Sequence, residues 1–329
     1  MTLAEWVREW SGTIVHLRPS TRIYEDNLRL HVLPSLGAVP LSKLTKTELR
    51  RWLAELAATD LSPASVHQAF RCLRRVLGAA AEGDVLARSP LAGIKPPRVE
   101  RREMRFLTAD EAATLAEMID ERYRAFVLVG AYCGLRWGEL AGLRRHRVDL
   151  LHRSVQVVEA LGIGENGRPT LLPVKAGASH RAITLPALVV EALEHHLTFY
   201  AGAGKTGFVF TAPHGGNLDV NTFRNRYWLP AVAAAGLAPL RVHDLRHTTA
   251  SLAIAAGADV KVVQSTLGHA SAAMTLAVTV TSCRARPRAS PSASTPSPAP
   301  RSRCALRRPS RCVRGIFAGW NADEPAVRQ

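Results

Sequence analysis

Residues 241–279 read RVHDLRHTTASLAIAAGADVKVVQSTLGHASAAMTLAVT and predict two short helices that carry basic side chains. The first helix holds His243 and Arg246, which lie three residues apart and therefore face the same way. His269 follows directly after the expected end of the second helix. Two imidazoles and a guanidinium can thus donate hydrogen bonds to one anionic group. A phosphate is the best match, because its oxygens suit the paired N–H donors of a guanidinium.

The ends of these helices are predicted from three residues. Glycine adopts the left-handed cap readily, so the first helix is expected to end at Gly257. Asp259 can cap the second helix, whose end is expected at Leu267–Gly268. On spacing alone, solvated or capping histidines are the commoner explanation of such a stretch. His243 and His247 also match the i, i+4 spacing of helical zinc ligands, but the general-base Glu of an H-E-x-x-H site is absent.

Length and charge describe a basic globular protein. The chain has 329 residues, enough for about two domains, and 47% of its residues are hydrophobic. Lysine and arginine number 43 against 27 acidic residues, which gives a formal net charge of +16. The excess is shared between residues 1–276 and a tail, 277–329. A polyanion such as nucleic acid is the expected partner, although cationic solubility would produce the same balance.

Membrane and disulfide patterns are weak in this sequence. No apolar run approaches the roughly twenty residues that cross a bilayer, and the start, MTLAEWVREW, carries acids without a signal-peptide pattern. We therefore expect a cytoplasmic protein with no membrane partner. The five cysteines show neither a disulfide framework nor a zinc-knuckle spacing.

Four segments are expected along the chain. Residues 1–92 predict a small helical domain. Residues 93–105, GIKPPRVERREMR, combine two prolines with a charge run and predict a basic interdomain linker. Residues 106–276 predict a larger domain. The Arg, Pro, Ser and Ala content of residues 277–329 is typical of a disordered segment that cannot form a core.

Two helix starts are marked in the first domain. Thr45 and Glu48 form a capping box, and Ser62 is followed by Pro63 at the first helical position, where the missing N–H costs nothing. Arginines on the exposed faces of these helices could follow a phosphate backbone, although a solvated basic face explains each of them taken singly. These arginines are Arg50, Arg51, Arg71, Arg74 and Arg75.

The larger domain changes from helical to alternating periodicity after its first helices. The alternation predicts three short strands in a meander, at about residues 155–157, 171–174 and 182–185. Lys175 falls in the turn between the last two strands. The expected fold is therefore mainly α with a small antiparallel sheet.

Three separated motifs resemble those of the tyrosine recombinases, the phage-integrase family of DNA breaking-and-rejoining enzymes. GLRWGEL occupies residues 134–140, VKAGASHR occupies 174–181, and HDLRH with LGH occupies 243–247 and 267–269. The joint occurrence of the motifs in this order is more specific than any one of them. The resemblance implies a helical core-binding domain and a catalytic domain that together clamp double-stranded DNA. It also implies assembly as a homo-tetramer on DNA.

The resemblance places the catalytic residues of the family on this chain. Two guanidiniums can hold the non-bridging oxygens of a phosphate, a lysine on a hairpin can act as general acid, and a histidine can act as general base. No metal or cofactor is implied, because the arginines take the part that Mg²⁺ plays in other phosphoryl-transfer sites. Glu139 matches the family's acidic residue and is expected to support the first arginine. The catalytic positions are Arg136, Lys175, His243, Arg246 and His269.

The family's tyrosine nucleophile has no counterpart here. Counting from His269, its position is Thr279, and no tyrosine follows Tyr227. Since the tyrosine forms the covalent 3′-phosphotyrosine, a chain with threonine there is expected to bind DNA without cleaving it. A non-catalytic DNA-binding protein, or a dominant inhibitor of an intact integrase, is the alternative function. Loss of the family's C-terminal helix is expected to weaken the tetramer.

A one-base shift of reading frame would explain this departure. If one nucleotide was lost near codon 277, the codon that spans Val278 and Thr279 can encode only Tyr, His, Asn or Asp. GC-rich choices over residues 278–295 then spell YGHLMPGEAESLAERLD, a Tyr-Gly-His followed by an acidic amphipathic helix. We predict that the tail is translated out of frame or that the sequence carries a one-base error. An evolved basic tail that binds DNA or RNA is the alternative, and third bases unable to spell Tyr-Gly-His would exclude the shift.

Overall fold

A computed structural model gives the structure of the 329-residue chain. It describes residues 1–13, 22–99, 104–164, 168–174 and 180–268. The tail predicted to be disordered lies outside these residues.

Two compact units divide the chain between Arg102 and Glu103. The first unit contains Met1–Arg102 and the short stretch Ile163–Arg168, and the second contains Glu103–Gly162 and the chain from Pro169 onwards. This division falls within the segment 93–105 that the sequence predicts as a linker. The linker and the outer limits of the domains stay predictions.

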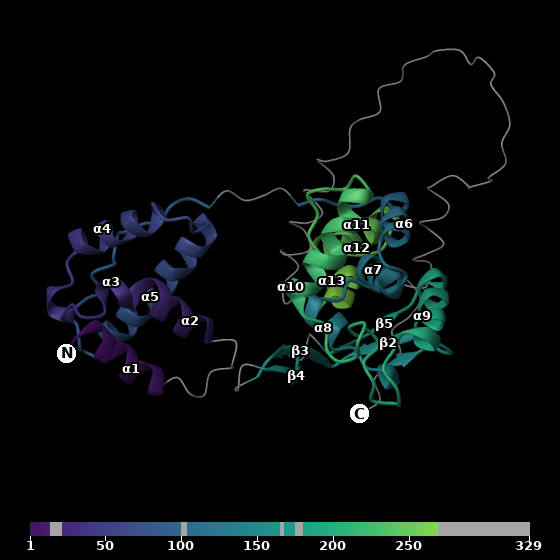
Figure 1. Ribbon diagram of the computed structural model, residues 1–329, viewed down its shortest axis with the longest axis horizontal. Helices are drawn as coiled ribbons and strands as arrows, with labels where there is room; N and C mark the ends of the chain where they lie inside the picture. Colours follow the sequence, from purple (N-terminus) through teal and green to yellow (C-terminus); the bar gives the residue numbers. More distant parts are fainter. Residues whose placement is uncertain (14–21, 100–103, 165–167, 175–179, 269–329) are drawn as a thin grey trace, which may run out of the picture. The chain divides into compact units, whose positions relative to one another are not determined.

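The first unit is a helical domain (Figure 1). Its helices enclose a core with three tryptophans, and two indole N–H groups in it find backbone acceptors. Trp6 Nε1 donates to Val76 O at 3.0 Å, and Trp52 Nε1 donates to His31 O at 3.0 Å. These bonds satisfy the polar atoms of side chains that are otherwise buried. The α-helices are α1 (Leu3–Thr13), α2 (Arg22–Asn27), α3 (Leu33–Leu36), α4 (Lys46–Ala57) and α5 (Pro63–Glu82).

Both predicted helix starts in this unit are confirmed. Thr45 Oγ1 accepts from Glu48 N at 3.2 Å, and Glu48 Oε2 accepts from Thr45 N at 2.9 Å, so the capping box before α4 is complete. Ser62 Oγ accepts from Ser65 N at 3.2 Å, and Pro63 occupies the first position of α5. Each bond satisfies a backbone N–H that has no partner within the helix.

The second unit is built around α7, and all but one of residues 123–133 are buried. α7 packs against α6, α9 and α12. A Cβ on Gly130 would stand 2.7 Å from Leu245 Cδ1, so glycine at this position lets α12 lie close to α7. The α-helices of this unit are α6 (Ala109–Met118), α7 (Glu121–Cys133), α8 (Trp137–Ala141), α9 (Ala187–Phe199), α10 (Val220–Phe223), α11 (Leu229–Ala234), α12 (Asp244–Ala255) and α13 (Val260–Leu267).

The strands of the second unit form two small antiparallel groups. β1 (Val148–Asp149), β2 (Ser154–Val157) and β5 (Arg181–Thr184) form a sheet in the order β1-β2-β5, with Val155 opposite Ile183. β3 (Glu159–Ile163) and β4 (Pro169–Pro173) pair only with each other among the described residues.

The predicted mainly α fold with a small antiparallel sheet is confirmed, but the predicted meander is wrong. β2 pairs directly with β5, whereas β4 pairs with β3. The reason is burial: Val155, Val157 and Ile183 lie in the core, while β3 and β4 are half-buried or exposed throughout. Alternation in the sequence identifies strands without identifying their partners. Within the described part of the chain, no helix has the length and apolar character needed to span a membrane.

Candidate functional site

The two helices predicted from residues 241–279 form as expected over their described part. His243 is the N-cap residue of α12, and Gly257 follows that helix with φ +92°. Asp259 Oδ1 accepts from Lys261 N at 2.7 Å at the start of α13. Gly268 then ends α13 in the left-handed conformation. The predicted ends and caps are confirmed, and both helix ends carry residues of the candidate site.

Arg246 is buried and its guanidinium is held by two backbone carbonyls. Nη1 donates to Gly134 O at 2.6 Å, and Nη2 donates to Leu267 O. Gly134 ends α7 with φ +66°, and a Cβ there would stand 2.4 Å from Leu267 Cδ2. The positive φ favours glycine at this position, and the missing Cβ leaves room for the Leu267 side chain beside the end of α7. The guanidinium of Arg246 is fixed where α7, α12 and α13 come together.

Arg136 lies against the same end of α13. Its Nη2 donates to Gly268 O at 3.2 Å, and its Nη1 donates to Glu139 Oε1 at 2.8 Å. The backbone N of Arg136 donates to Glu139 Oε2 at 2.9 Å. The side chain of Arg136 is 38% exposed while that of Glu139 is 3% exposed. The buried carboxylate of Glu139 therefore fixes Arg136 from the protein interior, and the exposed part of the Arg136 side chain can contact a ligand.

Arg181 was missed as a site residue by the sequence reasoning, although it ends the motif VKAGASHR. Its side chain is 5% exposed and forms an ion pair with Glu139, with 2.8 Å between Nη2 and Oε2. Nη1 also donates to Glu139 Oε1 at 3.2 Å, and Nε donates to Thr266 O at 2.6 Å. A motif arginine at the start of a strand was the available signal, but nothing local identified its partners.

The cluster carries three guanidiniums and one carboxylate. Burial alone would raise the pKa of Glu139, but the hydrogen bonds and charge of Arg181, followed by those of Arg136, lower it to about 2. Burial, followed by the charges of Arg136 and Arg181, lowers the pKa of Arg246 to about 9. At neutral pH all three arginines and the glutamate are charged. The surplus positive charge in a desolvated place favours binding of an anion.

His243 stands one helical turn before Arg246 and is exposed at the surface. Its ring meets that of His247 edge to face, with centroids 5.0 Å apart. Desolvation, followed by the charge of Arg246, lowers the pKa of His243, and desolvation followed by the charge of His243 lowers the pKa of His247 to about 4. His243 is therefore neutral near pH 7 and able to accept a proton. In the described part of the chain, no three His, Cys, Asp or Glu side chains are grouped as metal ligands.

The structure brings Arg136, Glu139 and Arg246 together, with His243 one turn away on α12. The other predicted positions, Lys175, His269 and Thr279, lie outside the described residues. Their roles stay predictions.

The five arginines predicted to contact DNA belong to α4 and α5 of the first unit, and all are exposed. Arg51 forms a long ion pair with Glu55, at 4.0 Å. Arg75 Cζ lies 6.0 Å from the centroid of the Tyr24 ring. Exposed guanidiniums of this kind are free to reorient toward a polyanion.

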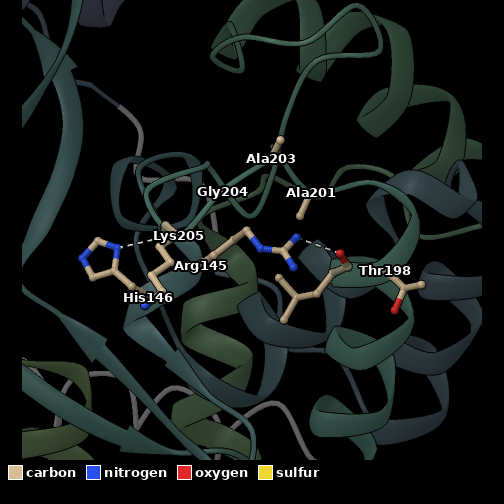
Figure 2. A pocket seen from close by; sticks show the side chains of 8 residues that line it. Arg145, His146, Thr198, Ala201, Ala203, Gly204 and Lys205 are labelled. Carbon is tan, nitrogen blue, oxygen red and sulfur yellow. Dashed lines mark hydrogen bonds between the residues drawn. The ribbon is translucent and has the colours of Figure 1, made fainter.

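A separate open hollow of about 830 Å³ lies beside the end of α9 (Figure 2). Two hydrogen bonds join residues that line the hollow. Arg145 Nη1 donates to Leu197 O at 2.8 Å, and His146 Nδ1 lies 3.0 Å from Lys205 O. The hollow contains none of the predicted site residues. Its lining residues are Arg145, His146, Leu197, Thr198, Ala201, Ala203, Gly204 and Lys205.

Known sequences match both units of the chain. Residues 105–279 match the phage integrase family, and residues 2–57 match the phage integrase N-terminal SAM-like domain. A putative prophage phiRv2 integrase of Mycobacterium tuberculosis (strain CDC 1551 / Oshkosh) is 31% identical over 257 residues. That alignment covers 77% of this chain and 67% of the relative.

Solved integrases share the fold. The Tn1549 transposon integrase in complex with a circular intermediate DNA superposes with a TM-score of 0.74 at 18% identity, over 84% of this chain and 95% of that one. A lambda integrase tetramer bound to a Holliday junction gives a TM-score of 0.64 at 21% identity, over 84% and 77%. The fold is thus that of the integrases, mostly helical with a small antiparallel sheet. The chain belongs to the phage integrase family, whose enzymes are tyrosine-type site-specific recombinases.

Proposed function

We propose that this chain binds double-stranded DNA as a site-specific recombinase and holds one backbone phosphate between Arg136 and Arg246. The observation that carries the proposal is a cluster in which Arg136 and Arg181 pair with the buried Glu139, while the buried Arg246 donates to carbonyls at the same helix end. A phosphate placed there would supply the negative charge that the cluster lacks. Its non-bridging oxygens would accept the N–H donors that the protein leaves open on Arg136.

The arrangement suits phosphoryl transfer because its donors are already in place. Arg246 is fixed by two carbonyls and Arg136 by Glu139, so neither must reorganise as charge develops on the phosphate. Electrostatic stabilisation by fixed donors is commonly the largest part of catalysis of this kind. Supporting this role, the two arginines donate to consecutive carbonyls, those of Leu267 and Gly268.

Proton transfers complete the proposed reaction. Neutral His243 would accept the proton of an attacking hydroxyl, and Lys175 would donate a proton to the leaving 5′ oxygen. His269, which directly follows α13, would donate a hydrogen bond to the phosphate. The assignment of Lys175 and His269 rests on the resemblance of the motifs VKAGASHR and LGH to those of the family.

We further propose that the chain as it stands is cleavage-defective. The family match ends at residue 279, where Thr279 occupies the position of the nucleophilic tyrosine. A threonine hydroxyl ends far short of the point that a phenolic oxygen reaches from the same backbone position. It is also much less acidic than the phenol. The chain would therefore bind the phosphate without forming a covalent intermediate.

Assembly on DNA follows from the same proposal. The Tn1549 and lambda integrases, which share the fold, were solved with DNA, the latter as a tetramer. The exposed arginines of the first unit would contact the phosphate backbone in a sequence-independent way. We propose a homo-tetramer on DNA, weakened here because the family's C-terminal helix has no counterpart in the sequence.

A covalent-trapping experiment tests the proposed function. Duplexes would first be selected from a random-sequence library by binding to this chain. They would then be nicked near each candidate cleavage point, so that a cleaved strand diffuses away. We expect no protein–DNA adduct from the present chain, and an adduct once the reading frame after codon 277 is restored with a tyrosine at the nucleophile position. An adduct from the present chain, or none from the restored chain, would contradict the proposal.

Thr279 at the position predicted for the nucleophile favours a second function, inhibition of an intact integrase. A chain that binds the same DNA without cutting it would occupy sites and join mixed assemblies. Mixing this chain with its frame-restored form should lower recombination more steeply than dilution alone. A linear decrease would argue against the inhibitory role.

A further inference from the structure

Arg181 is a buried guanidinium to which the proposed reaction gives no task. Its side chain is only 5% exposed. Each of the three guanidinium nitrogens donates a hydrogen bond. Nη1 and Nη2 donate to Glu139, and Nε donates to the carbonyl of Thr266. A group this deeply buried and this fully bonded acts through the residues it contacts.

The first of these contacts fixes the carboxylate that holds Arg136. Glu139 Oε1 accepts from Nη1 of both Arg136 and Arg181, and Oε2 accepts from the backbone N of Arg136 and from Nη2 of Arg181. Because a bidentate arginine defines the plane of its carboxylate, Arg181 sets the orientation of the oxygens to which Arg136 is bonded.

The second contact is to the last turn of α13, whose backbone carbonyls lack helical partners. The carbonyls of Thr266, Leu267 and Gly268 follow one another, and each accepts from a different arginine. Their donors are Arg181, Arg246 and Arg136 respectively. Arg136 and Arg181 both join the helix end to the carboxylate, but the side chain of Arg136 is 38% exposed whereas that of Arg181 is 5% exposed.

We propose that Arg181 is a positioning residue: it locks Glu139 and the C-terminal end of α13 together, so that Arg136 and Arg246 present their donors to one phosphate. This inference rests on the proposed function, because the phosphate is the ligand for which the arginines are aligned. Loss of Arg181 should weaken the contact with that phosphate and leave the rest of the DNA interface as it was.

The test measures the contribution of a single phosphate in the full-length chain. Duplexes selected by binding would be made with a neutral methylphosphonate at each backbone position in turn, and their affinities compared with the unmodified duplex. In the unchanged chain, a methylphosphonate at one position should lower the affinity about 10-fold or more, because charge-assisted hydrogen bonds to the phosphate are lost. In Arg181→Gln that ratio should fall to about 3-fold or less, as for other members of a hydrogen-bonded network. Affinity for the methylphosphonate duplex should stay unchanged.

Two variants separate positioning from charge and from stability. Arg181→Lys keeps the charge, but one ammonium cannot bond both carboxylate oxygens and the Thr266 carbonyl, so the ratio should again fall. Arg144→Gln is the matched control. Arg144 forms another bidentate pair in the same unit, half-buried, with Glu159 at 2.5 and 2.8 Å, and its loss should lower stability while the ratio stays at its original value.

The outcomes are distinct. If Arg181→Gln folds poorly, pairing it with Glu139→Gln removes the orphaned carboxylate, and the ratio should still be low. A ratio that survives Arg181→Gln, or that Arg181→Lys restores in full, would overturn the positioning role alone. If no phosphate position is sensitive in the unchanged chain, the proposed function fails and this inference fails with it.

Discussion

The arginines of the two units differ in how they are held. The five of the first unit that are predicted to contact DNA lie on the exposed faces of α4 and α5. Three of the second unit, Arg136, Arg181 and Arg246, meet at Glu139 or at the end of α13, and the side chains of Arg181 and Arg246 are almost completely buried. An exposed arginine can adapt to any phosphate of a duplex, but a buried and bonded one can serve a single phosphate in a fixed place. The two sets of arginines therefore differ in how far each guanidinium can move.

The largest effect is expected when a buried arginine of the second unit is replaced. Arg246→Gln removes the donors to Gly134 O and Leu267 O in a buried place, and leaving such acceptors unsatisfied should cost about 3 kcal/mol of unfolding free energy. It should also abolish the sensitivity of binding to the methylphosphonate at the critical position. Urea unfolding and the affinity ratio measure the two effects. Arg74→Gln, which alters an exposed arginine, is the control and should change neither.

A pH dependence distinguishes the buried carboxylate from exposed ones. Its folded-state pKa of about 2 lies below the ordinary value of 4.5, so Glu139 contributes stability above pH 4.5 that is lost as pH falls toward 2. The unfolding free energies of the unchanged chain and of Glu139→Gln should therefore converge on acidification through that window. Burial also lowers the pKa of His247 to about 4, but its contribution, lost between pH 6.5 and 4, is common to both proteins. A constant difference down to pH 3 would show that Glu139 is not held by the arginines.

A smaller effect, on DNA affinity, is expected when the exposed arginines of α4 and α5 are replaced. Replacing the five arginines of α4 and α5 that are predicted to contact DNA by glutamine should lower the slope of log affinity against log salt by about 0.9 for each phosphate that the chain no longer neutralises. The decrease in affinity should be similar for selected and random duplexes, because these side chains carry no fixed geometry. Fluorescence anisotropy over a series of salt concentrations measures it. A decrease confined to the selected duplex would assign sequence readout to this face.

The smallest effect is expected from a single exposed arginine. Arg51 and Glu55 are 72% and 64% exposed and stand 4.0 Å apart, so Arg51→Gln should change the unfolding free energy by less than about 0.5 kcal/mol. Thermal unfolding at low and high salt would detect a larger contribution. A change above about 1 kcal/mol would mean that this face is more ordered than its exposure indicates.

Local features of the fold were open to prediction from the sequence because their partners lie within a few residues. The capping box of Thr45 and Glu48, and the cap at Asp259, each join residues two or three apart. Strand pairing was harder to predict from the sequence. The alternating pattern predicted β2, β4 and β5 but did not predict that β4 pairs with β3. Burial of β2 and β5 against the core decided that pairing.

The candidate site was predictable in its members but not in its construction. Motif matches placed Arg136, Glu139, His243 and Arg246, and all four lie at or beside one cluster. Arg181 escaped notice because its partners are 42 and 85 residues away in the chain. No local spacing rule reaches that far.

The sequence by itself determined which motifs the chain carries, and it predicted where helices begin and end and that Thr279 stands where the family has its nucleophile. These properties depend on residue identity and on interactions within a helical turn. Only the tertiary structure decided that three arginines from three motifs donate to three consecutive carbonyls at the end of α13. That arrangement requires segments up to 132 residues apart to meet, and it depends on glycine at position 134 to let them approach.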